Sequence, residues 1–320
     1  MTSNQIKTET YALSKNAALS AIATTLMLSI TLVLTFFLSD EISDSVRNAL
    51  SLCAAVIIPS VFPFIIISEL LYCFIDFSPM KKLCSMFERL FKINRAGLYP
   101  FALGILCGFP LGVKCAAELY TEGRISKDEC ERLIGFCNNT GPAFLVCGIG
   151  LGLRNNIYDG IALYAATVLS AILVGMIFSV GEASSQIDKG LYSRSSFSMT
   201  RSIKNAGIGC LNICSYLTFF SCIVGFIKAI FGKGLIYIFT VPFLEIGTAT
   251  DILSKTELLG NISSLALTAF SVGFSGLSVH LQALSFLSDT DVRTGKYFVM
   301  KLIQGIIATA LVTVAYPFFH

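Results

Sequence analysis

The 320-residue sequence contains no tryptophan, only two histidines and few charged residues. Asp, Glu, Lys and Arg make up 13% of the chain, about half their share in soluble domains, while hydrophobic residues make up 54% and the mean hydropathy is +0.75. These values predict an integral membrane protein. Because Trp is absent, aromatic residues at the membrane interfaces must come from the 11 Tyr and 26 Phe. The net charge of +3 is too small and too scattered to indicate a nucleic-acid partner.

The chain also lacks the patterns that would indicate a metal centre, a cofactor or an enzyme. It has 11 Cys but no CxxC motif, and its histidines, His280 and His320, are isolated. Metal and redox sites need clustered ligands, and no nucleotide-binding loop or hydrolase elbow is present. We therefore expect no cofactor, no metal and no enzymatic activity. Most of the cysteines lie within apolar runs, where they act as small packing residues.

The segment Gly97–Arg124 contains two apolar arms around the break Cys-Gly-Phe-Pro-Leu-Gly. Pro110 blocks helix continuation, and Gly108 and Gly112 loosen the backbone beside it. Each arm is too short to span a bilayer, which needs about 20 residues. The pattern predicts a re-entrant hairpin, because bent backbone at membrane depth is tolerated only inside protein or beside a wet cavity. The alternative is one helix kinked at Pro110.

A related pattern occurs in the segment Leu258–Ser288, where two apolar arms flank the break from Gly273 to Gly276. Aligning this break with the one at 108–112 gives two halves of similar design, although apolar segments also align by chance. Interrupted segments at matching places in two halves are typical of transporter binding sites. We therefore predict an all-α polytopic membrane protein with two inverted repeats. Each repeat would contain one re-entrant hairpin, and an extra transmembrane helix would precede them.

The remaining segments divide the chain. We expect an N-terminal tail and first transmembrane helix in residues 1–45, a first repeat in 46–180, a cytoplasmic linker in 181–205 and a second repeat in 206–320. Residues 76–95 are amphipathic and predict a helix on the membrane surface. Ser126 and Glu129 have the spacing of a helix capping box. Whether residues 234–255 span the membrane or re-enter it stays open.

The Lys and Arg distribution predicts the orientation. The segments 76–95, 114–132 and 181–205 are rich in basic residues, whereas 39–48 and 154–159 are poor in them. If 97–124 is re-entrant, all three rich segments lie on one side, which the positive-inside rule assigns to the cytoplasm.

Polar residues inside apolar runs are the candidate binding residues. Asn138-Asn139-Thr140 precedes a Gly-Pro pair, which indicates an unwound segment with free backbone groups, or else an interfacial helix cap. Glu245 interrupts another apolar run, and a carboxylate at membrane depth indicates function unless it lies in an interfacial loop. The predicted solute-binding residues are Asn138, Asn139, Thr140, Glu245, Thr248, Ser275, Ser278, His280, Gln282 and Lys114. The predicted hairpin-turn residues are Gly108, Pro110, Gly112, Gly273 and Gly276.

Two of these assignments have equally simple alternatives. A lone helical His, such as His280, is usually a packed residue and only sometimes a ligand. Lys114 is compatible with a lysine that extends its amine to the membrane surface.

The motifs GFPLGVKCAAELYTEGRISKDECERLIGFCNNTGP, FLEIGTATDIL and GFSGLSVHLQALSFL resemble those of YlbJ-like sporulation integral membrane proteins. That family belongs to the nucleoside-recognition (Gate) domain group. The resemblance implies a carrier or facilitator for a small polar organic solute, with dipicolinic acid as the candidate, in the outer forespore membrane of a spore-forming bacterium. Independently of the resemblance, the composition predicts the lipid bilayer as the surroundings, and a carboxylate at membrane depth such as Glu245 is suited to bind a coupling cation, to carry a proton or to accept hydrogen bonds from the solute. The stretch 246–250 departs from the more polar sequence expected there.

Two other functions remain compatible with these patterns. One is a nucleoside-type or other Gate-domain transporter, and the other is a non-transporting membrane scaffold in spore-envelope assembly.

Overall fold

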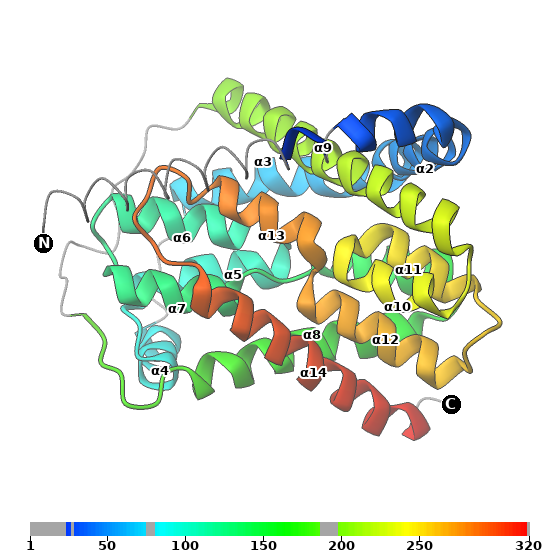
Figure 1. The fold of residues 1–320 in the computed structure, drawn as a ribbon. Coiled ribbons are helices and arrows are strands. Elements are labelled where there is room, and N and C mark those ends of the chain that lie inside the picture. The colour runs from blue at the N-terminus through cyan, green and yellow to red at the C-terminus, as the bar shows by residue number, and fades with distance from the viewer. Residues whose placement is uncertain (1–23, 27–28, 75–80, 186–197, 319–320) are drawn as a thin grey trace, which may run out of the picture.

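The computed structural model describes residues 24–26, 29–74, 81–185 and 198–318, and every regular element in these ranges is helical (Figure 1). The expected all-α membrane class is confirmed. Four helical stretches in these ranges are long and apolar enough to cross a membrane: Ile157–Ile177, Met199–Phe231, Asn261–Ser285 and Gly295–Phe318. A fifth crossing is present if the bent pair Thr24–Phe37 and Ser39–Ala55 counts as one.

In chain order the helices are α2 (Ser39–Leu52), η1 (Cys53–Ile57), α3 (Ile58–Phe74), α4 (Lys81–Phe91), η3 (Arg95–Gly97), α5 (Leu98–Leu106), α6 (Leu111–Thr121), α7 (Lys127–Cys137), η4 (Ala143–Leu153), α8 (Ile157–Ile177), α9 (Met199–Phe231), α10 (Leu235–Leu244), α11 (Ile246–Lys255), α12 (Asn261–Phe274), α13 (Gly276–Ser285), α14 (Gly295–Ala315) and η5 (Tyr316–Phe318). The stretches η1 and η4 are π-helical. The first transmembrane helix expected at 17–38 lies mostly outside the described residues.

The segment 97–124 forms two helices, α5 and α6, that pack against each other and lie side by side (Figure 1). This arrangement replaces the alternative of one kinked helix. Gly108 adopts φ +87°, which favours glycine, and Pro110 immediately precedes α6. A Cβ at Gly112 would lie 2.1 Å from the carbonyl oxygen of Cys137, so the pair packs backbone to backbone on the end of α7.

The helix α7 begins as expected and ends at the polar cluster. Ser126 accepts a hydrogen bond from the Glu129 amide, and Glu129 accepts one from the Ser126 amide, so the capping box is complete. After Cys137 the chain leaves the helix for residues 138–142 and then continues in η4. We call residues 138–142 the first break.

The second half differs from the expected hairpin at 258–288. There α12 and α13 follow one another as a single span-length stretch, Asn261–Ser285, interrupted at Ser275. The helices that instead lie side by side are α10 and α11, which contact each other on either side of Glu245 (Figure 1). The expectation of a turn at 273–276 is corrected to a break within one crossing. We call the interruption at Ser275 the second break.

The reason for the wrong alignment is a shared backbone requirement. Ser275 and Gly276 have φ values of +78° and +65°, and Gly108 is also left-handed. Similar Gly-Phe sequences therefore appear at a turn in one half and at a helix break in the other. In chain order, the adjacent helices α5 and α6 precede the first break, and the adjacent helices α10 and α11 precede the second.

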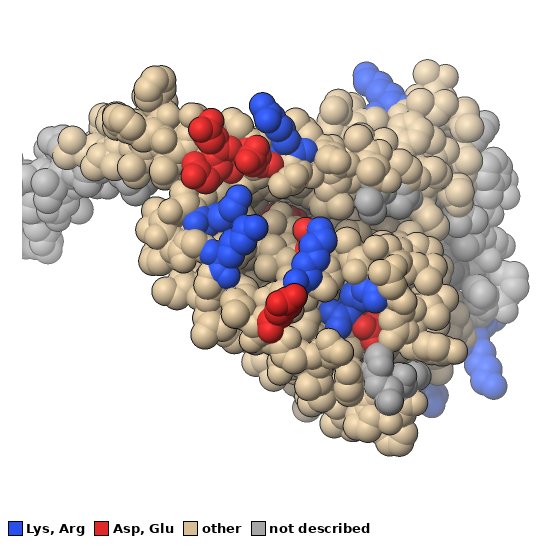
Figure 2. All heavy atoms as spheres, turned by 90° about the vertical axis from the view of Figure 1, so that its right-hand side faces the viewer, with Lys and Arg blue, Asp and Glu red and all other residues tan. Residues whose placement is uncertain are grey.

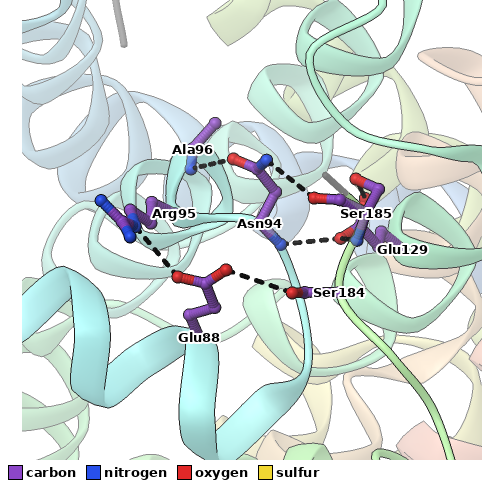
Figure 3. Close-up of polar contacts among 7 residues, drawn as sticks. All are labelled: Glu88, Asn94, Arg95, Ala96, Glu129, Ser184 and Ser185. Atoms are coloured by element: carbon purple, nitrogen blue, oxygen red, sulfur yellow. Dashed lines mark hydrogen bonds and ion pairs between the residues drawn. The ribbon is translucent and has the colours of Figure 1, made fainter. Parts of the chain in front are cut away.

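One end of the molecule is held together by a carboxylate network (Figure 3). Glu129 accepts hydrogen bonds from the amides of Asn94 and Ser185, at 2.7 and 2.8 Å, and from the Ser185 hydroxyl. Glu88 accepts from Ser184 and pairs with Arg95. The network joins α4, the start of α7 and the residues after α8, so the segments 81–95 and 182–185 lie at the same end.

At the opposite end, charged side chains of both signs gather near the centre of the face (Figure 2). Arg154, after η4, forms an ion pair with Asp159 at 2.6 Å and donates to Ser264 at 3.1 Å. Ser264 in turn donates to the Leu253 carbonyl. These contacts connect η4, α8, α11 and α12.

The linker expected at 181–205 is only partly described. Helix α9 begins at Met199, so the end of that segment is helical, and residues 186–197 lie outside the described ranges.

Candidate functional site

The interruptions of the two halves meet inside the helix bundle. A Cβ at Gly108 would lie 2.7 Å from the Gly141 amide nitrogen, so the turn between α5 and α6 touches the first break. A Cβ at Gly276 would lie 3.2 Å from the Leu244 carbonyl oxygen, so the junction of α10 and α11 touches the second break. The Thr140 hydroxyl donates to the Val272 carbonyl at 3.5 Å and links the two regions.

A cavity of about 60 Å³ lies between these interruptions. Four of the predicted site residues line it: Thr140, Glu245, Ser278 and Gln282. The rest of its wall is mainly apolar and comes from η1, α3, α9, η4 and the turn between α5 and α6. An apolar enclosure with a few convergent polar groups is typical of a small-molecule site.

Glu245 is the one acidic or basic side chain in the wall formed by the described residues. It is 1% exposed and occupies the N-cap position of α11. Its carboxylate accepts hydrogen bonds from the amides of Gly247 at 2.7 Å and Thr248 at 2.5 Å. The helix N-terminus therefore stabilises this carboxylate at a depth where an uncompensated charge would be costly.

Two further helix N-termini contribute to the wall of the cavity. Gly141, Ala143 and Phe144 at the start of η4 line it, and so do Ser278 and Val279 in the first turn of α13. In the part of the chain that the structure describes, neither helix has a side-chain hydrogen bond at its N-cap. The first N–H groups of a helix lack intrahelical partners, so these positions favour a ligand with acceptor oxygens.

Two other predicted site residues, Asn138 and Asn139, are fully buried in a network with α14. Asn139 donates to the Phe136 carbonyl at 2.7 Å and accepts from Gln304 Nε2 at 2.8 Å. The Asn138 carbonyl oxygen accepts from Lys301 Nζ at 2.7 Å. Side chains of α14 therefore occupy the space beside the first break.

His280 is also buried and belongs to this network. Asn138 Nδ2 donates to the Tyr297 hydroxyl at 2.9 Å, and that hydroxyl lies 2.8 Å from His280 Nδ1. The hydroxyl donates to Nδ1 in one tautomer of the ring and accepts from Nδ1–H in the other. The ring packs edge-on against Phe274 and Phe298. Within the described residues, Nε2 has no hydrogen-bond partner.

The structure places the remaining predicted residues away from the cavity wall. Ser275 is buried, and its hydroxyl donates to the Val272 carbonyl at 3.3 Å. Thr248 contributes its amide to Glu245. Lys114 lies on α6 with 23% of its side chain exposed and faces Glu118, one turn away, at 4.0 Å.

Sequence reasoning missed three buried polar residues of α14: Tyr297, Lys301 and Gln304. Lys301 also donates to Gln304 Oε1 at 2.7 Å. The available signal was a lysine and a glutamine three residues apart within the last apolar run, since such pairs share one helix face and an ionisable residue in a membrane span indicates function.

The interrupted helices, the central cavity and the apolar exterior define a polytopic helical membrane protein. Comparison with known proteins gives one significant relative. The chain is 26% identical over 311 aligned residues to the sporulation integral membrane protein YlbJ of Bacillus subtilis (strain 168), and the alignment covers 84% of this chain and 76% of the relative. The resemblance to YlbJ-like proteins is confirmed by this match. No family model matches the chain. No solved structure matches it either.

Proposed function

We propose that the protein is a membrane carrier or facilitator for a small polar organic solute, and that the cavity between the two breaks is its binding site. The observation that carries this proposal is the convergence of two N-termini without side-chain caps, those of η4 and α13, on the cavity that contains Glu245. Discontinuous helices whose ends point at a site are typical of secondary transporters.

The proposal includes an architecture of two inverted repeats. The outer ends of α5 and α6 lie at the end of the molecule that contains α4, whereas those of α10 and α11 lie at the other end (Figure 1). Two re-entrant helix pairs entering from opposite sides would meet at one depth. The α4 end, with the segments 81–95 and 182–185, would face the cytoplasm.

The chemistry of the wall favours a solute with both acceptor and donor groups. Helix N-termini favour carboxylate or carbonyl oxygens, while Glu245 and Gln282 Oε1 are acceptors, and Gln282 Oε1 has no hydrogen-bond partner among the described residues. Dipicolinic acid, which the relationship to YlbJ-like proteins suggests, is the first candidate. A solute carboxylate beside Glu245 would be repelled unless a proton is shared between them. We therefore propose that a proton accompanies the solute, and that the forespore membrane is where transport occurs.

Uptake of labelled solutes into vesicles containing the purified protein tests this function. Glu245→Gln and Ser278→Ala should each lower dipicolinate uptake about ten- to hundredfold, because each change removes or alters a polar partner worth about 1–3 kcal/mol in the site. Lys114→Ala is the matched control, since Lys114 lies outside the cavity wall, and it should transport at the parent rate.

Two outcomes would contradict the proposal. If the parent protein is folded but takes up neither dipicolinate nor nucleosides, a scaffold in spore-envelope assembly becomes the better interpretation. If Glu245→Gln and Ser278→Ala both transport as the parent does, the cavity is not the binding site.

A further inference from the structure

Lys301 lies in the first third of α14 and is completely buried, although it carries an amine. Its Nζ donates to the Asn138 carbonyl oxygen and to Gln304 Oε1, each at 2.7 Å. Among the residues that the structure describes, Lys301 takes part in no ion pair. A buried lysine is normally paired with a carboxylate, so the pairing of Lys301 with neutral oxygens alone requires an explanation.

One of the two oxygens around Lys301 lies at the end of a helix. Asn138 directly follows the last residue of α7, and the carbonyls at a helix C-terminus lack intrahelical partners and carry partial negative charge. The Asn139 side chain donates a hydrogen bond to the Phe136 carbonyl, and Lys301 donates one to the Asn138 carbonyl. The side-chain oxygen of Asn138, Oδ1, is buried and has no hydrogen-bond partner among the described residues.

Gln304 is oriented so that its oxygen must face the amine. Its Nε2 donates to Asn139 Oδ1 at 2.8 Å and to the Thr167 carbonyl at 3.3 Å. With both amide hydrogens used in this way, Oε1 is directed to Lys301 as an acceptor. Two neutral oxygens, the Asn138 carbonyl and Gln304 Oε1, thus face one amine, and oxygens of these kinds are among the ligands that proteins present to a dehydrated alkali cation.

We propose that the first break is a cradle for a monovalent cation and that the ammonium of Lys301 is its tethered occupant. The intact protein then takes up no free ion at this place, and removal of the amine by truncation creates a site for Na⁺, K⁺ or a small alkylammonium ion. This inference concerns cation binding and does not depend on whether the protein transports a solute.

Thermal unfolding of the purified full chain in detergent tests the inference. The parent, Lys301→Ala and Lys301→Met are compared in choline chloride, NaCl, KCl and methylammonium chloride at equal ionic strength. Lys301→Ala empties the cradle, whereas Lys301→Met fills it with an uncharged chain of similar length. We expect Lys301→Ala to melt below the parent in choline and to regain about 4 °C or more, saturably, with at least one of the small cations. The melting temperature of the parent should be the same in all four salts, and so should that of Lys301→Met.

The inference is overturned if Lys301→Ala melts identically in all four salts, or if Lys301→Met responds as strongly as Lys301→Ala. If Lys301→Ala cannot be obtained folded in choline, the yield of monodisperse protein replaces the melting temperature. Recovery in a small-cation salt then supports the cradle, and failure in every salt overturns it.

Discussion

The two breaks are similar events in the backbone, but their surroundings differ. At the first break, Gln304 and Lys301 reach across from α14 and bind polar groups of Asn138 and Asn139, so only the later residues, Thr140 and Gly141, line the cavity. Beside the second break, Ser278 and Glu245 line a cavity. The difference teaches that an interrupted helix is not by itself a binding site. Whether its free groups bind a ligand depends on which side chains the neighbouring helix supplies.

The largest effect should come from Gly112→Ala, which tests how closely the helix pair α5 and α6 packs on the first break. The new Cβ would lie 2.1 Å from the Cys137 carbonyl oxygen. Because this oxygen belongs to the backbone, no change of side-chain rotamer can relieve the clash. We expect a loss of about 3 kcal/mol or more, or no folded protein, because overpacking against backbone exceeds the usual range of about 1–3 kcal/mol. Circular dichroism melting and size-exclusion profiles measure this.

The matched control is Gly207→Ala on α9, where a Cβ would meet nothing within 4 Å. It should be neutral or stabilising by up to about 1 kcal/mol. Gly276→Ala, at the second break, should lie between the two, since its Cβ would lie 3.2 Å from Leu244 and its φ is +65°. Equal melting temperatures for all three variants would contradict the tight packing.

Asn139→Ala should have an intermediate effect and tests whether the hydrogen bonds to α14 at the first break contribute more to stability than the polar groups of the cavity wall do. The change leaves the Phe136 carbonyl and one Gln304 donor without their partners inside the protein. We expect a loss of about 1–3 kcal/mol in stability. Ser278→Ala, at the cavity, should change the melting temperature little, by the equivalent of about 0.5 kcal/mol or less. Our comparison of the breaks would be wrong if Asn139→Ala were as stable as Ser278→Ala.

The smallest effect concerns the N-termini of α7 and α12, the helices that lead into the first and the second break. Helix α7 starts with a complete capping box, whereas α12 starts without a side-chain cap. Burial acts to raise the pKa of Glu129, but hydrogen bonds from Ser185, Ser126 and Asn94 outweigh it and hold that pKa below its ordinary value. Because the folded pKa is the lower one, Glu129 stabilises the protein above the unfolded pKa of about 4.3.

That stabilisation should be lost as the pH falls from about 4.3 through the folded pKa of Glu129. Melting temperatures measured from pH 7 to pH 3.5 should therefore decline more steeply for the parent than for Glu129→Gln. Parallel pH profiles would show that the network of Figure 3 contributes no pH-dependent stability.

Local signals in the sequence gave correct local predictions. Proline and left-handed glycine located the turn at 108–110, and the Ser126–Glu129 spacing located the start of α7. Whether the chain turns back after a break or continues across the membrane was not predictable from the sequence. A residue with positive φ, such as Ser275, is compatible with both. Tertiary packing decides between them.

The same limit applies to the candidate site. Glu245, Thr140, Ser278 and Gln282 stand out in the sequence because they are polar within apolar runs, and the structure places them on one cavity. Nothing in the sequence pairs α14 with residues 138–142, which are more than 150 positions away. The assignment of Asn138 and Asn139 to a sealed network therefore required the fold.

Helix α9, Met199–Phe231, is 33 residues long and runs along the outside of the bundle (Figure 1). At about 1.5 Å per residue it measures about 50 Å, well beyond the roughly 30 Å hydrocarbon core of a bilayer. Such a helix must lie inclined or extend past the lipid surface, and the inclination changes with membrane thickness. Since α9 packs on α3 and α13, which both line the cavity, a change in its inclination would alter the contacts that it makes with two helices of the cavity wall.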